Sequence, residues 1–128
     1  FVALENLLRT ADVVSLHGPL TRETHHLVEE TALAFMKPTA ILVNTARGQV
    51  VDERALVAAL RAGSLAGAAL DVYEFEPEVS EGLLELDNVV LTPHIASATR
   101  DTRLAMGMLC VDALRAVLLE GRTPSNAV

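Results

Sequence analysis

Three short segments of the chain carry an arginine, acids and a histidine that together could pass a proton and a hydride at a carbonyl group. They are NTARG at residues 44–48, DVYEFEP at 71–77 and LTPHIAS at 91–97. An arginine grips a carboxylate with two parallel donors, and a histidine exchanges protons near neutral pH, especially when a carboxylate holds its other ring nitrogen. Arg47 is therefore a candidate carboxylate-binding residue, and His94 with Glu76 a candidate acid–base pair.

Each of these side chains also has an ordinary explanation. Arg47 could be a solvated residue of a strand-to-helix turn, Glu76 one loop acid among several, and His94 a solvated loop histidine. Their neighbours favour the functional interpretation. Asp52 can cap a helix that begins soon after Arg47, and Pro93 stiffens the loop before His94.

The hydrophobic pattern predicts alternating helices and strands. Nearly continuous apolar runs at 12–16, 40–44, 66–72 and 88–91 are typical of parallel strands that helices cover on both faces. Helical patterns lie at 4–10, 29–36, 52–62 and 102–120, with Gly63 as a stop signal after the third. This alternation predicts an α/β fold with a parallel sheet.

Polar residues follow the end of each predicted strand. In an open parallel sheet the ligand crevice lies beyond the carboxyl ends of the strands. The segments at 17–20, 45–48, 71–77 and 92–99 should therefore meet at one rim. Asp71 comes after small apolar residues, where a flat ligand could approach and a carboxamide NH2 could donate to the carboxylate.

Composition excludes several classes of protein. A net charge of −7 argues against a nucleic-acid partner, which needs clustered Lys and Arg. The most apolar segment, 104–119, is interrupted by Asp112 and Arg115, so no membrane segment is expected. The single Cys110 cannot form an internal disulfide, and no secretory leader is recognisable, so a cytoplasmic location is expected.

Other reactive side chains are expected to be structural. His17, His25 and His26 lack a matching pattern of metal ligands, so no metal is predicted. Cys110 is expected in the core, because it lies within an apolar helix. That helix, 102–120, is apolar around most of its circumference and is expected to pack against another domain or subunit.

Four segments resemble a known family in order and spacing. ADVVSLHGPLTRETHHLV, MKPTAILVNTARGQVVDERAL, GAALDVYEFEP and LTPHIASAT resemble the D-isomer-specific 2-hydroxyacid dehydrogenases, and most of all their glyoxylate/hydroxypyruvate reductase branch. The resemblance implies the C-terminal half of a Rossmann-type, doubly wound parallel sheet with three layers. It also implies NAD or NADP as cofactor, reduction of a small 2-keto acid to a D-2-hydroxy acid, and a homodimer.

The resemblance further implies a role for individual residues. Arg47 would bind the substrate carboxylate, Glu76 would pair with the histidine, and His94 would donate the proton. Asp71 would hold the nicotinamide carboxamide, the loop after the first strand would lie beside the adenosine half, and Ala96 stands where the family commonly has glycine. The implied cofactor-binding residues are His17, Gly18, Pro19, Thr24, Thr45, Ala46, Arg47, Asp71, His94, Ala96 and Ser97.

The chain is expected to be part of a longer protein, because it begins with Phe1 and contains no GxGxxG fingerprint. Residues 1–121 would be the C-terminal portion of the NAD(P)-binding domain, and 122–128 a connector towards a substrate domain. Strand 12–16 would then form an exposed apolar edge, so weak cofactor affinity and poor solubility are expected for this chain alone.

Two alternatives stay open: a dinucleotide-sensing interaction protein, similar to the corepressors that share this fold, and an inactive fragment. A formate dehydrogenase is less expected, because Glu76 is an acid where that branch uses an amide. The preference for NAD or NADP also stays open, as does the choice among glyoxylate, hydroxypyruvate and larger 2-keto acids.

Overall fold

The computed structural model describes residues 1–127. They form two compact units, one of residues Phe1–His94 and one that begins at Ile95. No change of composition marks this point in the sequence. The assignment of 1–121 to a cofactor domain and 122–128 to a connector stays a prediction, and Val128 lies outside the described residues.

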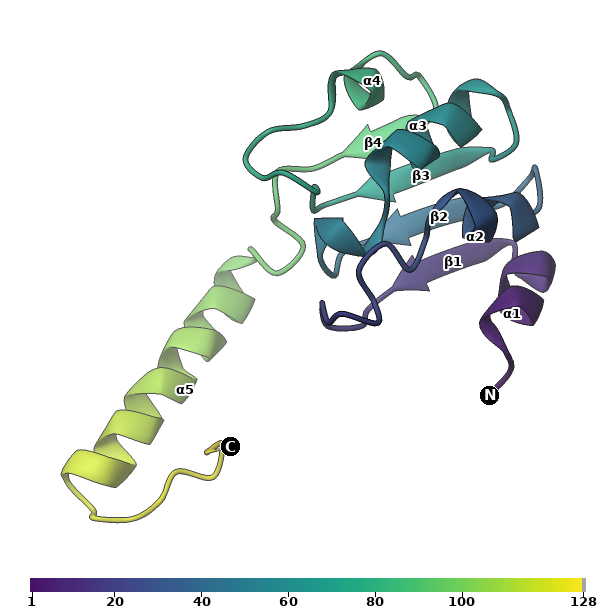
Figure 1. Ribbon diagram of the computed structural model, residues 1–128. Helices are drawn as coiled ribbons and strands as arrows, with labels where there is room; N and C mark the ends of the chain where they lie inside the picture. Colours follow the sequence, from purple (N-terminus) through teal and green to yellow (C-terminus); the bar gives the residue numbers. More distant parts are fainter. Residues whose placement is uncertain (128) are drawn as a thin grey trace. The chain divides into compact units, whose positions relative to one another are not determined.

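The first unit contains a four-stranded parallel sheet with the strand order β1-β2-β3-β4 (Figure 1). The strands are β1 (Val13–Leu16), β2 (Ile41–Asn44), β3 (Gly67–Leu70) and β4 (Val89–Leu91). All four lie within the predicted apolar runs, and the α/β class with a parallel sheet is confirmed. Parallel pairing places the loops that follow all four strands at one edge of the sheet.

Four α-helices and one 3-10 helix accompany these strands. They are α1 (Leu4–Thr10), α2 (Glu30–Phe35), the 3-10 helix η1 (Gly48–Val50), α3 (Glu53–Arg61) and α4 (Glu81–Leu84). Helix α1 precedes β1, and the others connect successive strands. As predicted, Asp52 caps α3, since its carboxylate accepts a hydrogen bond from the Ala55 amide at 3.0 Å. Gly63 follows α3 with a φ of +69°, which fits its predicted role as a stop signal.

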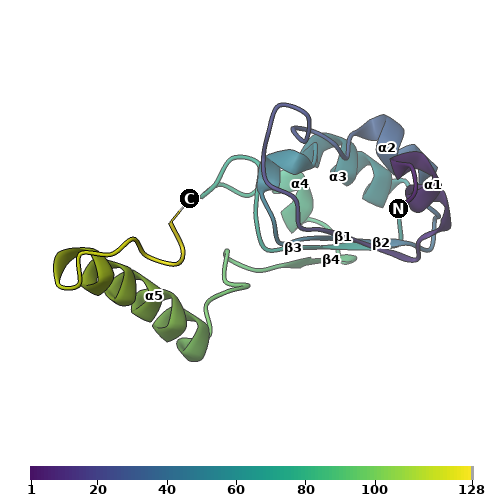
Figure 2. The ribbon, with the colours of Figure 1, turned by 90° about the horizontal axis from the view of Figure 1, so that it is seen from below.

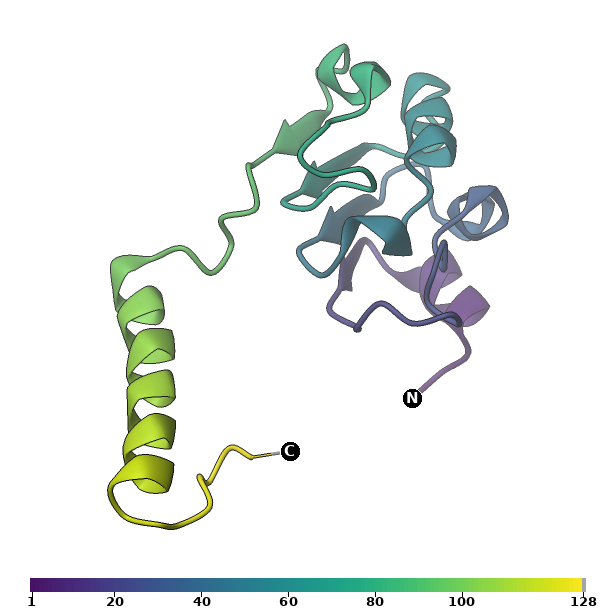
Figure 3. The same ribbon diagram turned by 60° about the vertical axis from the view of Figure 1, so that its left-hand side comes forward.

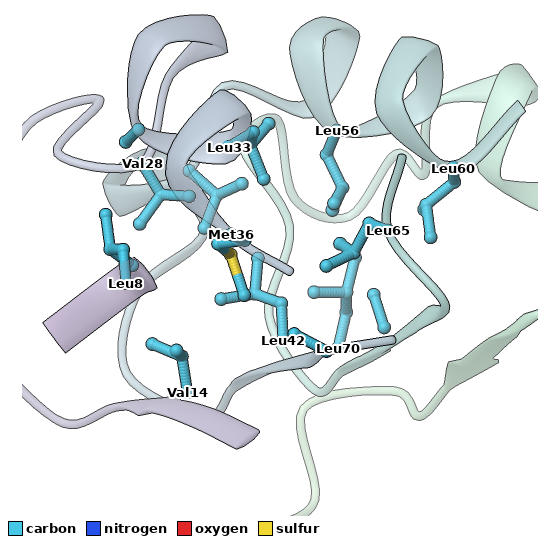
Figure 4. Packing of buried hydrophobic residues seen from close by; sticks show 14 of the residues in the cluster. Leu8, Val14, Val28, Leu33, Met36, Leu42, Leu56, Leu60, Leu65 and Leu70 are labelled. Carbon is cyan, nitrogen blue, oxygen red and sulfur yellow. The ribbon is translucent and has the colours of Figure 1, made fainter. Parts of the chain in front are cut away.

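The helices α1 to α4 lie on one face of the sheet, where they enclose the core (Figure 2). Leu42 of β2 is fully buried there, together with Leu33 of α2 and Leu56 of α3 (Figure 4). Burying a leucine side chain of this kind contributes about 1.5–3 kcal/mol to stability. Aliphatic packing between sheet and helices therefore fixes the strands whose ends carry the candidate site.

The opposite face of the sheet is open within the first unit. Val13 of β1, Ile41 of β2 and Val90 of β4 are 58%, 42% and 63% exposed, whereas their neighbours Val14 and Leu42 are buried. Two of the three expected layers thus lie within residues 1–94, and the third stays a prediction. Among the described strands β1 pairs only with β2, so it forms the exposed apolar edge that the sequence predicted.

The second unit is one long helix, α5 (Arg100–Leu118), with a tail that contains no further helix or strand up to residue 127 (Figure 3). Thr99 caps it by accepting a hydrogen bond from the Thr102 amide at 3.2 Å. The predicted core position of Cys110 is wrong, because this thiol is exposed. Ala116 is the only buried residue of α5, so the apolar composition of the helix does not by itself bury the cysteine.

Among the described residues, no helix combines the length and the apolar character that crossing a bilayer requires.

Candidate active site

The loop that carries Arg47 is fixed by a buried asparagine at the end of β2. Asn44 is 1% exposed; its Oδ1 accepts a hydrogen bond from the Ala46 amide at 3.1 Å, and its Nδ2 donates to the Arg47 carbonyl at 3.0 Å. The Arg47 side chain itself is exposed, and its Nη1 donates to the Ala46 carbonyl at 2.6 Å. A rigid backbone thus presents a guanidinium at the surface, as capture of a small anion requires.

Glu76 and His94 lie in hydrogen-bond contact, although 18 residues separate them. The His94 Nδ1 is 2.9 Å from the Glu76 Oε2, and the Tyr73 amide donates to the Glu76 Oε1 at 3.0 Å. Both carboxylate oxygens therefore have a partner, and one of them holds the imidazole ring. A carboxylate on one ring nitrogen orients the ring and leaves the other nitrogen to exchange a proton.

A tight turn after β4 places His94. The residue has a φ of +54°, in the left-handed region that residues other than glycine rarely adopt. Its amide donates to the Thr92 carbonyl at 3.0 Å, and the buried Tyr73 hydroxyl donates to the same carbonyl at 2.8 Å. Tyr73 therefore supports both members of the pair, Glu76 through its amide and the turn of His94 through its hydroxyl.

The surroundings change the acidity of two groups. The hydrogen bond from His94 lowers the pKa of Glu76; the Tyr73 amide and the charges of His94 and Arg47 act in the same direction, and burial opposes them. Burial raises the pKa of Tyr73, and the negative charges of Asp71 and Glu53 add to this. At neutral pH Glu76 is therefore ionised and Tyr73 keeps its proton.

Arg47, Glu76 and His94 line one open pocket of 540 Å³. Gly48 begins η1 beside it, and a Cβ at this position would lie 1.9 Å from the backbone carbonyl of Tyr73. Only glycine allows this approach of the two loops. The structure thus brings the three predicted catalytic residues together from the loops after β2, β3 and β4.

Asp71 is buried at the end of β3, where its Oδ1 accepts a hydrogen bond from the Thr92 hydroxyl at 2.5 Å. Of the other predicted cofactor-binding residues, His17 contacts the Ser15 hydroxyl at 2.8 Å, and Thr24 donates to the Pro19 carbonyl at 2.7 Å. These contacts order the loop after β1.

The remaining predicted cofactor-binding residues lie in three places. Gly18 is exposed after β1. Thr45 is exposed and Ala46 buried, both after β2. Ala96 and Ser97 are exposed in the second unit, and their assignment stays a prediction. Within residues 1–127, no three His, Cys, Asp or Glu side chains are placed to hold a metal ion together.

Sequence reasoning missed the supporting residues Asn44 and Tyr73. The only signals were an amide at the end of an apolar strand and the single tyrosine of the chain. Neither signal indicates which backbone groups these side chains hold.

Known proteins share both the sequence and the fold. The family model described as the D-isomer specific 2-hydroxyacid dehydrogenase NAD binding domain matches residues 1–96. A glyoxylate reductase from Pyrococcus horikoshii is 57% identical over 128 residues, which are all of this chain and 38% of that protein.

Two solved structures resemble the chain closely. The TT0316 protein of Thermus thermophilus has a TM-score of 0.93 and 56% identity, and the match covers all of this chain and 41% of that one. An NADPH-dependent glyoxylate/hydroxypyruvate reductase from Sinorhizobium meliloti has a TM-score of 0.88 and 42% identity, over 94% of this chain and 38% of that one. The chain thus spans about two fifths of these relatives, and it belongs to the NAD-binding domain of the D-isomer-specific 2-hydroxyacid dehydrogenase family.

Proposed function

We propose that this chain carries the catalytic side of the cofactor domain in a reductase that converts a small 2-keto acid of the glyoxylate/hydroxypyruvate type into a D-2-hydroxy acid. The observation that carries the proposal is the Glu76–His94 contact of 2.9 Å in the pocket that Arg47 also lines. A cation for the carboxylate and a proton donor for the carbonyl oxygen are the two protein groups that such a reduction needs.

Each of the three side chains has a separate task. Arg47 binds the substrate carboxylate through paired hydrogen bonds and so sets the position of the neighbouring carbonyl. His94 gives its proton to the carbonyl oxygen as negative charge develops there. Glu76 holds the Nδ1 side of the ring and so keeps the other nitrogen directed to the pocket.

The residues present fit the nicotinamide half of a dinucleotide. Asp71 offers a buried carboxylate at the end of β3, as a carboxamide NH2 requires, and Ala46 is small and buried at the end of the neighbouring strand. When bound, the reduced nicotinamide supplies the hydride. NAD or NADP serves equally in this proposal. The expected homodimer rests on the family resemblance and on the apolar helix at 102–120, and the expected cytoplasmic location on the cysteine content.

The test is an enzyme assay of the preparation with glyoxylate or hydroxypyruvate as substrate. The reaction is monitored as the decrease in absorbance of NADH or NADPH. The intact mass of the preparation is first compared with that of 128 residues, because the relatives are longer. Chiral chromatography of the glycerate formed from hydroxypyruvate decides the stereochemistry. We expect His94→Ala to lower kcat by about 10²- to 10⁴-fold, which is the usual contribution of a general acid.

Arg47→Gln separates binding from proton transfer. We expect KM to rise by about 10- to 100-fold, because a hydrogen bond to a charged group contributes about 1.5–3 kcal/mol. His25→Ala is the control, since this exposed histidine does not line the pocket. Near-normal turnover of the His94→Ala enzyme would contradict the assignment. Cofactor binding without turnover on any 2-keto acid would favour the dinucleotide-sensing alternative.

A further inference from the structure

A buried carboxylate that this mechanism does not use lies at the start of α3. Glu53 is 2% exposed. Its Oε1 accepts a hydrogen bond from the Glu74 amide at 2.7 Å, and its Oε2 accepts from the Ser80 hydroxyl. A buried charge is costly unless it is hydrogen-bonded, so α3 and the loop after β3 must keep these contacts together.

Glu74 is held from several directions. Its Oε1 lies 2.8 Å from the His26 Nε2, and its Oε2 accepts a hydrogen bond from the Glu53 amide at 3.3 Å. Gln49 donates to the Glu74 carbonyl at 2.9 Å. The contact between Glu53 and Glu74 is thus reciprocal, since each carboxylate accepts from the other residue's amide.

This contact lies directly beside the acid–base pair in the chain. Glu74 follows Tyr73, whose amide holds the Glu76 carboxylate, and precedes Glu76 by two residues. Any shift of Glu74 moves both the donor and the acceptor of that hydrogen bond. We propose that Glu53 is a positioning residue that fixes the loop 73–76 and thereby holds Glu76 against His94.

This proposal rests on the proposed function only in treating Glu76 and His94 as a catalytic pair. The effect of Glu53 on the position of Glu76 is tested without substrate or turnover. If Glu53 served stability alone, its loss would lower the melting temperature and leave the environment of Glu76 unchanged. A positioning role requires that the pKa of Glu76 respond, because the hydrogen bonds from His94 and from the Tyr73 amide both lower it.

The experiment compares Glu53→Met with Glu53→Gln in this chain, with the Glu76 carboxyl carbon titrated by NMR. Both variants lose the same negative charge, which by itself would lower the pKa of Glu76. The Gln side chain can still accept from the Glu74 amide and donate to the Ser80 hydroxyl, whereas Met has a similar length and can do neither.

We expect the pKa of Glu76 to rise towards its ordinary value in Glu53→Met and to stay low in Glu53→Gln. Arg47 and His94 are present in both variants, so a difference in the Glu76 pKa reports where Glu76 lies relative to these groups and not the loss of a charge. Equal Glu76 pKa values in the two folded variants would overturn the proposal, whatever the enzyme assay shows.

Glu53→Asp decides the matter if Glu53→Met does not fold. It keeps the charge of the parent chain but withdraws the carboxylate by one methylene from the Glu74 amide. We expect the Glu76 pKa to rise relative to the parent chain, although the charge is the same. A folded Glu53→Asp chain with an unchanged Glu76 pKa would refute the positioning role.

Discussion

One carboxylate oxygen of Glu76 accepts a hydrogen bond from the Tyr73 amide and the other contacts the His94 ring. The stability that these contacts provide should therefore depend on pH. The pKa of Glu76 lies below the ordinary value of 4.5, chiefly because of the hydrogen bond with His94. A group whose pKa is lowered on folding stabilises the protein fully above its unfolded pKa. That stability is lost as the pH falls through the folded value.

We therefore predict that Glu76→Gln lowers the melting temperature most near neutral pH, and that the difference from the parent chain shrinks below about pH 4.5, near the ordinary pKa of glutamate. Once Glu76 is protonated, the parent chain and the variant both carry an uncharged group there. Thermal unfolding of the two chains, measured from pH 7 downwards, checks this. A difference that grows on acidification would show that the folded pKa is not lowered.

At the same scale, sequence reasoning identified Arg47, Glu76 and His94 by residue type and by family resemblance, and the structure places all three on one pocket. The contacts among these side chains could not be predicted from the sequence, because the Glu76–His94 distance depends on a turn with positive φ and on the Tyr73 amide. Glu53 was overlooked, since an acid in the first turn of a helix already has an ordinary explanation in the helix dipole.

The strands were predictable to within one or two residues because each is an almost continuous apolar run. α4 was not predicted: it has four residues, one of them buried, and no side-chain cap. So short a helix carries no periodicity that a sequence pattern could display.

The junction between η1 and the loop after β3 depends on a close approach of two backbones. A Cβ on Gly48 would lie 1.9 Å from the Tyr73 carbonyl group, so Gly48→Ala must push the loops apart. We predict a loss of about 1–3 kcal/mol in the free energy of unfolding, as for other overpacked sites. Denaturant titration measures it.

Gly18→Ala is the control for Gly48→Ala, because it makes the same substitution at a glycine in the loop after β1. A Cβ at Gly18 meets nothing within 4 Å, so its effect should stay within about 0.5 kcal/mol. If Gly48→Ala proved as harmless as Gly18→Ala, the two loops would not be in the tight contact that the surroundings of Gly48 indicate.

For the molecule as a whole, burial is uneven. In the first unit the helices cover one face of the sheet and leave apolar side chains on the other, and in the second unit α5 is exposed along most of its length. Continuous apolar strands and an apolar helix are suited to burial on more sides than each unit by itself provides. The sequence pattern thus predicted which surfaces need a partner, but it could not identify that partner.

Adjacent residues of β1 allow this to be tested, because Val13 is 58% exposed on the open face and Val14 is 5% exposed in the core. We predict that this chain self-associates as its concentration rises, and that Val13→Thr weakens the association without loss of stability. Val14→Thr should instead cost about 1–3 kcal/mol, because it buries a hydroxyl among aliphatic groups. Sedimentation velocity and denaturant unfolding measure the two effects. A chain that stays monomeric at all concentrations, or a Val13→Thr variant as unstable as Val14→Thr, would mean that the open face is not an exposed apolar surface.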